Sequence, residues 1–335
     1  MTENASPHPD ENPTEPDRRH DVVVIGGGPA GLSAALVLGR ARRRTLVVDA
    51  GEPRNAPAAH MHGYLSRDGM PPAEFLAVGR EEIARYGVEL VRDRAVDVRR
   101  DGGFTVELAS GRAVRARQLV VATGLKDELP PLPGLAERYG NDVLHCPYCH
   151  GWEVRDRAFG VLATTAMSVH QALMVTQWSK DVTLFLHEIA PEELSDDDLR
   201  RLAAAGVAVV PGAVAEVVAG GGRLTGVRLA DGTVHGREVL FVAPRAVPRT
   251  GLLARLGAEL RETPFGAYPV VDERGLTTVP GLWAAGNASG YAEQVVNAAS
   301  RGYRAGAAIN GELLFADLDA AVAAGSAGPG SAARV

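Results

Sequence analysis

Two stretches of the chain share one pattern of apolar positions, and each predicts a strand, a turn and a helix. In the first, a continuous apolar run at residues 22–25 precedes a glycine turn and a segment, residues 32–38, with apolar side chains at helical spacing. In the second, the run covers residues 159–162 and the helical segment covers residues 169–175. Each unit is followed by another apolar run, at residues 45–48 and 182–186. Strands that alternate with helices in this way predict parallel α/β layers.

The composition is that of a globular protein with enough apolar mass for real cores. Of 335 residues, 46% are hydrophobic and 23% are charged, and the net charge is −6. Since the longest basic run is Arg42-Arg43-Arg44, a nucleic-acid-binding surface is not expected. Residues 1–20 contain no apolar stretch and residues 317–335 are rich in Ala and Gly, so both are predicted to be flexible tails. No window is apolar enough for a membrane helix, and we expect a cytoplasmic protein.

The first turn has the sequence Gly-Gly-Gly-Pro-Ala-Gly (residues 26–31), which fits the pattern G-x-G-x-x-G. In this pattern Gly26 permits a tight turn, Gly28 lets the backbone approach a pyrophosphate, and Gly31 allows the helix to pack closely on the strand. The helix N-terminus behind the turn attracts the anion. Asp49 ends the next strand, 23 residues after Gly26, where a ribose-binding carboxylate is expected. The alternative is a turn that only tightens the fold, but strand, helix and carboxylate together predict dinucleotide binding.

Only two cysteines occur in the chain, Cys146 and Cys149, which is too few for a secreted disulfide framework. Cys-x-x-Cys-His is also the attachment motif of c-type haem, and with His145 and His150 the segment contains the ligand types of zinc. Haem attachment is disfavoured because it requires export and no signal segment is present. Zinc is disfavoured because the histidines directly flank the cysteines, so no metal is expected. A redox-active dithiol is preferred over two inert buried cysteines.

Two distant segments resemble the flavoprotein disulfide reductases that have two dinucleotide domains. Residues 120–124, Val-Val-Ala-Thr-Gly, are similar to the Ala-Thr-Gly segment of that family. Residues 278–287 are similar to its late Gly-Asp segment, which contacts the flavin ribityl chain. Asn287 replaces the usual Asp, and its amide oxygen can still accept a hydrogen bond from a ribityl hydroxyl.

Over residues 21–316 the chain resembles the low-molecular-weight thioredoxin reductases. In those enzymes the residue after the second cysteine is an Asp that donates a proton, whereas here it is His150. Cys-Pro-Tyr-Cys-His-Gly-Trp-Glu (residues 146–153) is instead similar to the flavin-dependent dithiol oxidases that close disulfides in natural products such as gliotoxin and holomycin. Residues 49–55 and 60–65 also resemble this branch.

The resemblance implies an α/β fold of two nested Rossmann-like domains and an assembly of two identical subunits, a homodimer. The FAD domain, residues 21–128 and 244–316, is split by an inserted NAD(P)H-type domain, residues 129–243. FAD is the implied cofactor. The residues that the motifs place against it are Gly26, Gly28, Pro29, Ala30, Gly31, Asp49, Arg54, Asn55, His62, Ala122, Thr123, Gly124, Gly286, Asn287, Gln294 and Val295.

The second nucleotide motif departs from the pattern of an NADPH-dependent reductase. Residues 163–168, Ala-Thr-Thr-Ala-Met-Ser, lack both leading glycines, so Cβ atoms occupy the space where backbone must approach a pyrophosphate. The next strand ends in His187 and Glu188 in place of the basic pair that holds a 2′-phosphate. We therefore expect that this domain keeps its fold and does not bind NADPH.

These features predict a dithiol oxidase that passes electrons from a small-molecule dithiol to the cysteine disulfide, to FAD and to O2, which yields H2O2. Substrate thiolate attacks Cys146, the outer cysteine, and by family position Cys149 faces the flavin. His150 is the expected proton acceptor, and His145 either shares that role or is structural. Two alternatives remain: a thioredoxin reductase-like enzyme fed by NADPH or another donor, and a flavin-containing redox sensor.

Overall fold

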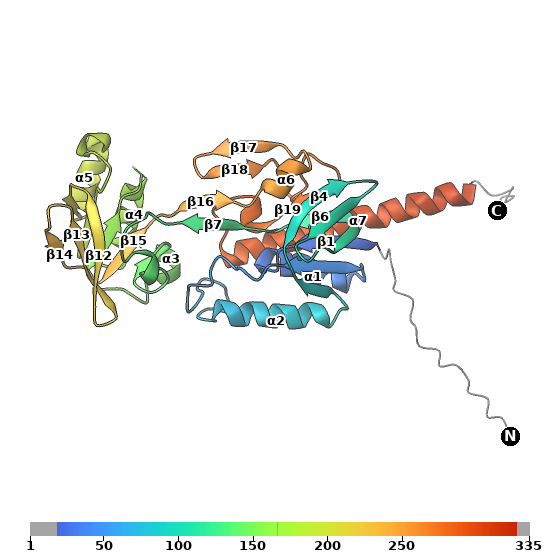
Figure 1. Cartoon of the computed structure of the whole chain (residues 1–335), viewed down its shortest axis with the longest axis horizontal. Helices are drawn as coiled ribbons and strands as arrows, with labels where there is room; N and C mark the ends of the chain where they lie inside the picture. The colour runs from blue at the N-terminus through green and yellow to red at the C-terminus, as the bar shows by residue number, and fades with distance from the viewer. Residues whose placement is uncertain (1–18, 166, 327–335) are drawn as a thin grey trace, which may run out of the picture.

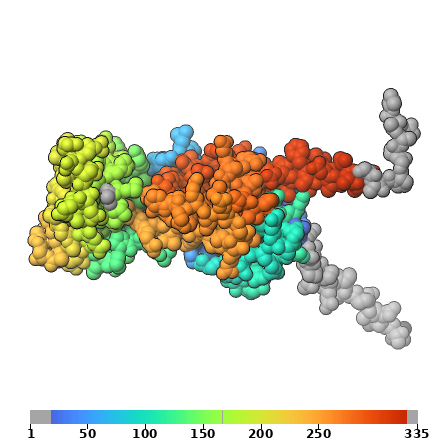
Figure 2. Space-filling view, turned by 90° about the horizontal axis from the view of Figure 1, so that it is seen from above, coloured from blue at the N-terminus to red at the C-terminus, as the bar shows by residue number. Residues whose placement is uncertain are grey.

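The apolar runs of the sequence form the central strands of two separate sheets. The structure is a computed structural model that describes residues 19–165 and 167–326. Residues 1–18 of the predicted N-terminal tail, Ala166 of the second motif and residues 327–335 of the predicted C-terminal tail lie outside that part of the chain. Figures 1 and 2 show two lobes, with the inserted segment forming one and both ends of the described chain in the other.

The larger lobe contains a seven-stranded sheet in the order β3-β2-β1-β6-β5-β4, with β19 paired to β6. Strands β1, β2, β3 and β19 run parallel to their neighbours, whereas β4, β5 and β6 form an antiparallel meander. The strands are β1 (His20–Ile25), β2 (Thr45–Asp49), β3 (Glu89–Arg92), β4 (Ala95–Arg100), β5 (Phe104–Leu108), β6 (Ala113–Val121) and β19 (Leu282–Ala284). Since β19 comes from the far end of the chain, both chain halves build this one sheet.

Helices and short elements cover the first sheet and the loops beside it. The helices are α1 (Pro29–Arg40), α2 (Pro72–Ala84), α6 (Gly251–Arg255) and α7 (Val295–Ser326), and the remaining elements are the hairpin β17 (Leu260–Thr263) and β18 (Gly266–Pro269) and the 3-10 turn η3 (Gly286–Ala288). Helices α1 and α7 pack very closely, because a Cβ atom on Gly302 would lie 1.9 Å from the backbone oxygen of Ala30. This packing joins the two halves of the chain next to the first glycine turn.

The smaller lobe contains a parallel sheet of five strands in the order β11-β10-β9-β15-β8. Its strands are β8 (Val143–Leu144), β9 (Phe159–Leu162), β10 (Val182–Phe185), β11 (Ala208–Val210) and β15 (Val239–Val242). The antiparallel strands β12 (Val214–Gly220), β13 (Arg223–Leu229) and β14 (Val234–His235) form a second, three-stranded sheet. The helices are α3 (Pro147–His150), α4 (Ser168–Val175) and α5 (Asp196–Ala204), with 3-10 turns η1 (Ala136–Arg138) and η2 (Pro191–Glu193).

The chain passes between the lobes along two paired strands. Strand β7 (Leu125–Glu128) leaves the larger lobe and β16 (Arg245–Pro248) returns to it, and the two pair antiparallel from Leu125 with Pro248 to Glu128 with Arg245 (Figure 1). The predicted insertion points at residues 128 and 244 lie beside the ends of these strands. The nested α/β architecture expected from the sequence is therefore confirmed.

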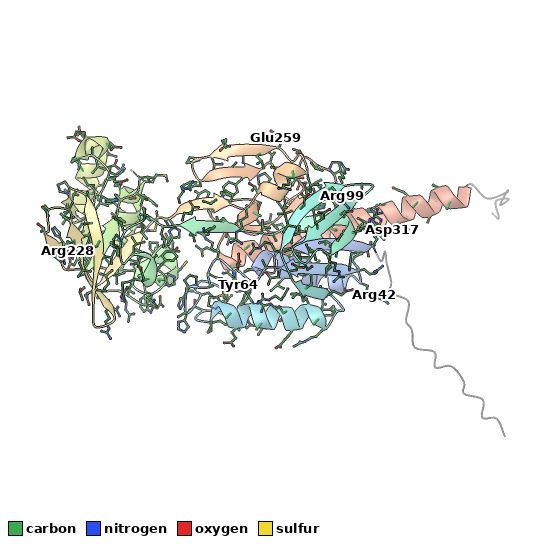
Figure 3. The ribbon with its side chains drawn as sticks, in the orientation of Figure 1. Arg42, Tyr64, Arg99, Arg228, Glu259 and Asp317 are labelled. Carbon is green, nitrogen blue, oxygen red and sulfur yellow. The ribbon has the colours of Figure 1, made fainter. Side chains whose placement is uncertain are left out.

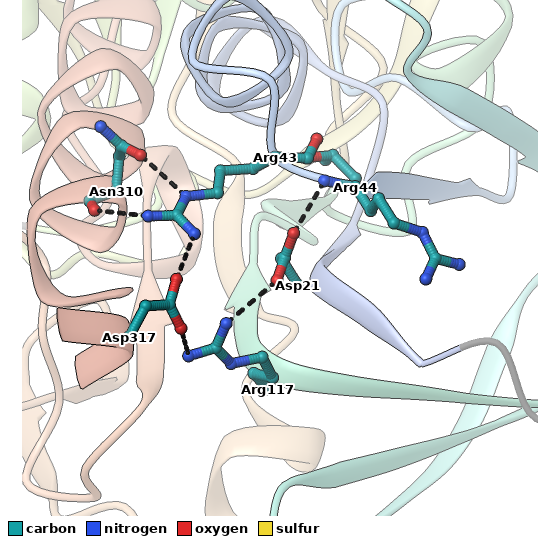
Figure 4. A network of polar contacts seen from close by, with 7 residues as sticks. Asp21, Arg43, Arg44, Arg117, Asn310 and Asp317 are labelled. Carbon is teal, nitrogen blue, oxygen red and sulfur yellow. Dashed lines mark hydrogen bonds and ion pairs between the residues drawn. The ribbon is translucent and has the colours of Figure 1, made fainter. Parts of the chain in front are cut away.

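The predicted C-terminal tail is partly wrong, because α7 continues through residues 317–326. Alanine is the best helix former, so an Ala-rich segment can extend a helix that is already nucleated. Asp317 also fixes this part of α7, since Arg43 and Arg117 both donate to its carboxylate, and Figures 3 and 4 show it where the helix leaves the lobe. Arg43 binds Asn310 on the same helix as well. No helix within residues 19–165 and 167–326 is long and apolar enough to cross a membrane.

Candidate active site

The first glycine turn leaves an open backbone surface at the start of α1. Gly26 has φ of 110°, a conformation that disfavours other residues, and a Cβ atom on Gly31 would lie 1.8 Å from the oxygen of Gly26. In contrast, nothing lies within 4 Å of a Cβ atom built on Gly28. Two of the glycines are thus required by the protein's own packing, while Gly28 leaves room for a ligand. The turn fits a dinucleotide pyrophosphate.

One cavity of about 900 Å³ extends from this turn to the cysteine pair. It is lined by Cys146, Cys149, His145 and His150 and by nearly all residues expected to contact FAD: Gly26, Gly28, Pro29, Ala30, Asp49, Arg54, Asn55, Ala122, Thr123, Gly124, Gly286, Asn287, Gln294 and Val295. The first residues of α1 and α7 both face it, so two helix N-termini point toward an anionic ligand. The cavity brings the predicted cofactor and redox residues of both lobes together.

Two of the expected flavin contacts do not line this cavity. Gly31 is buried in the contact between turn and helix, as its packing requires. His62 was expected near the flavin and instead faces Asp68 and Glu153, beside a second and smaller cavity. Its loop carries no periodic pattern that could have fixed its path.

Asp49 lies at the cavity wall and holds the glycine turn in shape. Its carboxylate accepts hydrogen bonds from the backbone N–H groups of Gly27 and Gly51, both at 3.2 Å, and from Arg92 at 3.0 Å. A carboxylate with four acceptor positions can bind these donors and a ribose hydroxyl. Asp49 is therefore placed to connect a ribose to the turn that holds the pyrophosphate.

Arg54 connects residues from three parts of the chain under the cavity. It forms a bidentate pair with Asp127, with both N···O distances 2.8 Å, and lies 3.4 Å from the amide oxygen of Asn287. The amide nitrogen of Asn287 donates to the carbonyl oxygens of Gly290 and Tyr291. An Asp at position 287 could not make these two donations, so the Asn shapes the loop that leads into α7.

The cysteines open the short helix α3, with Cys146 at the N-cap position. Both are free thiols in this structure. The thiol of Cys149 donates to the side-chain oxygen of Gln294 at 3.4 Å, and the amide nitrogen of Gln294 donates to the sulfur of Cys146 at 3.5 Å. Gln294 therefore contacts both sulfurs from the opposite lobe.

The two sulfurs have opposite protonation preferences. A hydrogen bond from the Cys149 thiol lowers the pKa of Cys146 to about 7, and the N–H groups of α3 and the Gln294 amide act in the same direction. The same hydrogen bond, together with burial, raises the pKa of Cys149 well above its usual value. In the reduced pair, Cys146 is the thiolate and Cys149 keeps its proton.

Both histidines that flank the pair are neutral bases. His145 places Nδ1 at 3.3 Å from the carbonyl oxygen of Val242, so Nδ1 carries the proton and Nε2 remains an acceptor. Burial and then the charge of Arg54 lower the pKa of His145. Burial also lowers the pKa of His150, although Glu153 opposes this effect. Each imidazole can therefore accept a proton at neutral pH.

In the second nucleotide turn, between β9 and α4, two described backbone donors are already bound. The hydroxyl oxygen of Ser168 accepts from the N–H groups of Thr164 and Thr165, at 3.1 and 3.5 Å. In a phosphate-binding turn such groups face the anion. At the end of β10, His187 Nδ1 accepts from the N–H of Val214 at 3.0 Å, and the side chain of Glu188 is 84% exposed. Positions 187 and 188 thus carry a histidine bound to the backbone and an exposed carboxylate where the basic pair was expected.

The sequence analysis missed several residues that line the large cavity. Asp127 pairs with Arg54 there, Tyr139 lies against the same pair, and Phe265 stacks on Tyr291 with ring centroids 3.7 Å apart. They come from loops and short strands whose contacts are distant in sequence, so no local motif marks them. Among the described residues, no group of three or more His, Cys, Asp or Glu could hold a metal ion.

Comparison with known proteins shows the family. A family model for "Pyridine nucleotide-disulphide oxidoreductase" matches residues 20–302. "Thioredoxin reductase sirT" of Leptosphaeria maculans is 33% identical over 90% of this chain and 96% of the relative. "Thioredoxin reductase tcpT" of Claviceps purpurea is 34% identical over 89% of this chain and 95% of the relative.

Solved structures agree with these matches. The crystal structure of HlmI superposes with a TM-score of 0.88 and 50% identity, over 92% of this chain and 96% of that one. The crystal structure of an oxidoreductase from Agrobacterium tumefaciens superposes with a TM-score of 0.83 and 41% identity, over 89% of this chain and 99% of that one. The resemblance to thioredoxin reductase-like flavoproteins is confirmed, and it implies FAD as cofactor. The chain belongs to the pyridine nucleotide-disulphide oxidoreductase family.

Proposed function

We propose that the protein is an FAD-dependent dithiol oxidase that closes a disulfide in a small molecule, with O2 as the electron acceptor and H2O2 as the second product. Bound FAD would take two electrons from the cysteine pair and pass them to O2. The first glycine turn, Asp49 and the N-terminus of α7 would hold it. The cysteine segment and the large cavity provide the place where a dithiol reacts.

The second nucleotide turn is the observation that carries this proposal. Ser168 occupies the backbone donors that a pyrophosphate would need, and Glu188 would repel a 2′-phosphate. If NADPH does not bind there, a substrate thiol is the proposed source of the electrons that reach the cysteines. The first turn, by contrast, keeps an open backbone surface at Gly28.

The protonation of the cysteines supports the order of steps. A substrate thiolate attacks the sulfur of Cys146 in the disulfide, which forms a mixed disulfide and releases Cys149. The second substrate thiol then attacks the substrate sulfur of that bond and expels Cys146. A thiol with a lower pKa leaves faster, and the pKa of Cys146 is lowered to about 7. Cys149, whose pKa is raised, takes up a proton on its release.

Two bases are available for the two substrate thiols. His145 Nε2 faces the same cavity as Cys146 with its tautomer fixed by Val242, and His150 directly follows Cys149. Either imidazole accepts a thiol proton at neutral pH because its pKa lies below the usual value. We assign the principal role to His150 because it also lines a second, smaller cavity.

The substrate would bind where both lobes line the cavity beyond the cysteines. Helix α4 contributes Met174 and His170, and the larger lobe contributes Phe265 and Tyr291. Pockets for small molecules are lined mainly by apolar side chains with a few polar groups among them. The lining favours a compact, largely apolar dithiol over a protein disulfide.

The alternative is a thioredoxin reductase-like enzyme that uses NADPH or another donor. The names of the two fungal relatives favour this alternative, since both are called thioredoxin reductases. It requires that a reductant reach the flavin or the cysteines through a site that lacks the usual backbone donors.

One anaerobic experiment distinguishes these functions. The purified yellow protein is mixed first with NADPH and then, in a separate sample, with dithiothreitol, while flavin absorbance is followed. We expect bleaching by dithiothreitol alone, and H2O2 when air is admitted. Cys149→Ser, which cannot form the disulfide, should not bleach. Rapid bleaching by NADPH would overturn the proposal in favour of the reductase, and no bleaching by either would favour the redox sensor.

A further inference from the structure

A second, smaller cavity of about 110 Å³ adjoins the large one. Its polar lining comes from His60, His62, His150 and Glu153. Three residues line both cavities: Gly140, Leu144 and His150. Of these, only His150 has a side chain that can gain or lose a proton. The space is sufficient for a few water molecules with several polar partners. His150 therefore lies in the wall between the cysteine site and a polar compartment.

A chain of titratable groups leads outward from this compartment. His62 places Nε2 at 3.5 Å from a carboxylate oxygen of Glu153 and Nδ1 at 3.4 Å from one of Asp68. The side chain of His62, which lies between the two carboxylates, is 18% exposed, whereas Glu153 is 42% and Asp68 is 67% exposed. A hydrogen bond from the N–H of Gly63, with a smaller effect of His62, lowers the pKa of Asp68 and keeps it ionised. The outermost group is thus a carboxylate in contact with water.

Proton balance requires such a route if the proposed function holds. Oxidation of a dithiol by the cysteine disulfide breaks two S–H bonds of the substrate and the S–S bond of the enzyme, and forms one S–S bond in the product. Two electrons remain on the cysteines as the Cys146 thiolate and the Cys149 thiol. The thiol of Cys149 retains one of the two protons, so one proton must leave the site.

Bound flavin and substrate would occupy the large cavity, and the second cavity offers a separate path for this proton. His150 is the one proton acceptor that also lines the second cavity. We propose that His150, Glu153 and His62, with the intervening cavity, form a proton relay that carries this proton from the cysteine site to the solvent at Asp68. Glu153 and His62 act through His150 and are positioning residues.

The charges that face His150 make the relay testable in two directions. Glu153 raises the pKa of His150, whereas His62 and His145 lower it against a background of burial. Glu153→Gln removes the negative charge, so the pKa of His150 should fall further. His62→Asn removes a group that lowers the pKa of His150, so this pKa should rise. If Glu153 and His62 served only to support the fold, their substitutions would not shift the pKa of His150 in opposite directions.

The experiment uses the FAD-loaded protein, with dithiothreitol as the dithiol and a pH indicator in weakly buffered, anaerobic solution. At neutral pH, Glu153→Gln and His62→Asn should each slow flavin bleaching and proton release together by about tenfold, less than the loss of a directly acting base. Glu192→Gln, at an exposed position in the same lobe as Glu153 but outside the lining of both cavities, is the matched control and should react as the wild type does. NMR titration of the His150 ring reports the two opposite pKa shifts without any turnover.

Wild-type rates and proton release in both variants would overturn the relay, as would shifts of the His150 pKa in the same direction. Failure of the proposed function is recognised separately, because the wild type itself would then not be bleached by dithiothreitol. In that case the NMR titration still decides whether Glu153 and His62 are electrostatically connected to His150. If the pKa of His150 in both variants equals that of the wild type, the proposal is refuted.

Discussion

The thiolate character of Cys146 gives the most direct quantitative test of the site. Its pKa is lowered from 9.0 to about 7, so at pH 7 about half of the reduced protein carries the thiolate, compared with about 1% for an ordinary thiol. Intrinsic nucleophilicity falls with pKa, with a Brønsted slope of about 0.4–0.5, which removes roughly a factor of eight. Cys146 should therefore react about sixfold faster than an ordinary thiol at pH 7.

The assay measures thiol–disulfide exchange with 4,4′-dithiodipyridine as a function of pH, in protein kept fully reduced under anaerobic conditions. The rate for the wild type should have its midpoint near pH 7. Gln294→Met removes the amide that donates to Cys146 at 3.5 Å and keeps the size of the side chain. A neutral hydrogen bond contributes about 1 kcal/mol, so the midpoint should rise by about 0.7 pH unit.

Gln177→Met, at an exposed position after α4, is the matched control and should leave the profile unchanged. A wild-type midpoint near 9 would refute the assignment of the thiolate to Cys146. An unchanged midpoint in Gln294→Met would show that the amide does not stabilise the thiolate, and the contact between the lobes would then have no chemical role.

Three further predictions concern the flavin turn, the cysteine order and the last helix. Gly28→Ala should keep the thermal midpoint and weaken FAD binding at least about tenfold, because its Cβ atom enters only the cavity. Gly31→Ala should lower stability by about 1–3 kcal/mol, since its Cβ atom would meet a backbone oxygen at 1.8 Å; equal thermal midpoints for the two variants would contradict this distinction. Cys149→Ser, mixed with glutathione disulfide, should accumulate a mixed disulfide between Cys146 and glutathione as one glutathione thiol leaves, detectable by mass spectrometry, and its absence would count against Cys146 as the sulfur that exchanges with substrate. Hydrogen bonds from Arg117 and then Arg43 lower the pKa of Asp317, so its stabilising contribution is present above the unfolded pKa and is lost as the pH falls through the folded one. Asp317→Asn should therefore show a smaller drop in thermal midpoint on acidification than the wild type, and an equal drop would count against the network of Figure 4.

Much of the fold follows from local sequence because its signals are local. The strand at residues 22–25, the glycine turn and helix α1 require only the order of neighbouring residues, and the structure has all three. The position of Asp49 at the end of β2 follows from the length of the helix between the strands. Even the split of the larger lobe was indicated, since the two flavin motifs occur on either side of the second unit.

The parts that were not predicted depend on distant contacts. Nothing near Gln294 shows that its amide reaches both sulfurs, which lie about 145 residues away. The pairing of Arg54 with Asp127 likewise depends on how the 50–71 loop folds back. That loop contains several turns and no periodic pattern, which is why His62 was assigned to the flavin and lies elsewhere. The Ala-rich end of α7 was misassigned because its anchors come from distant parts of the chain, Arg43 from the loop before β2 and Arg117 from β6.

If the second unit binds no nucleotide, its retained fold needs another reason, and the cysteine segment supplies one. Gln171 on α4 donates to the backbone oxygen of His145 at 2.7 Å, directly before the cysteines. At the end of the same helix, Trp178 packs edge-to-face on Tyr148, and a Cβ atom on Gly151 would lie 2.7 Å from its ring. In a nucleotide-binding unit the N-terminus of this helix would face the phosphates. Here α4 and the residues that follow it support the redox segment from both sides. Substitutions that loosen α4 should therefore change the reactivity of the cysteines, even in an enzyme that never binds NADPH.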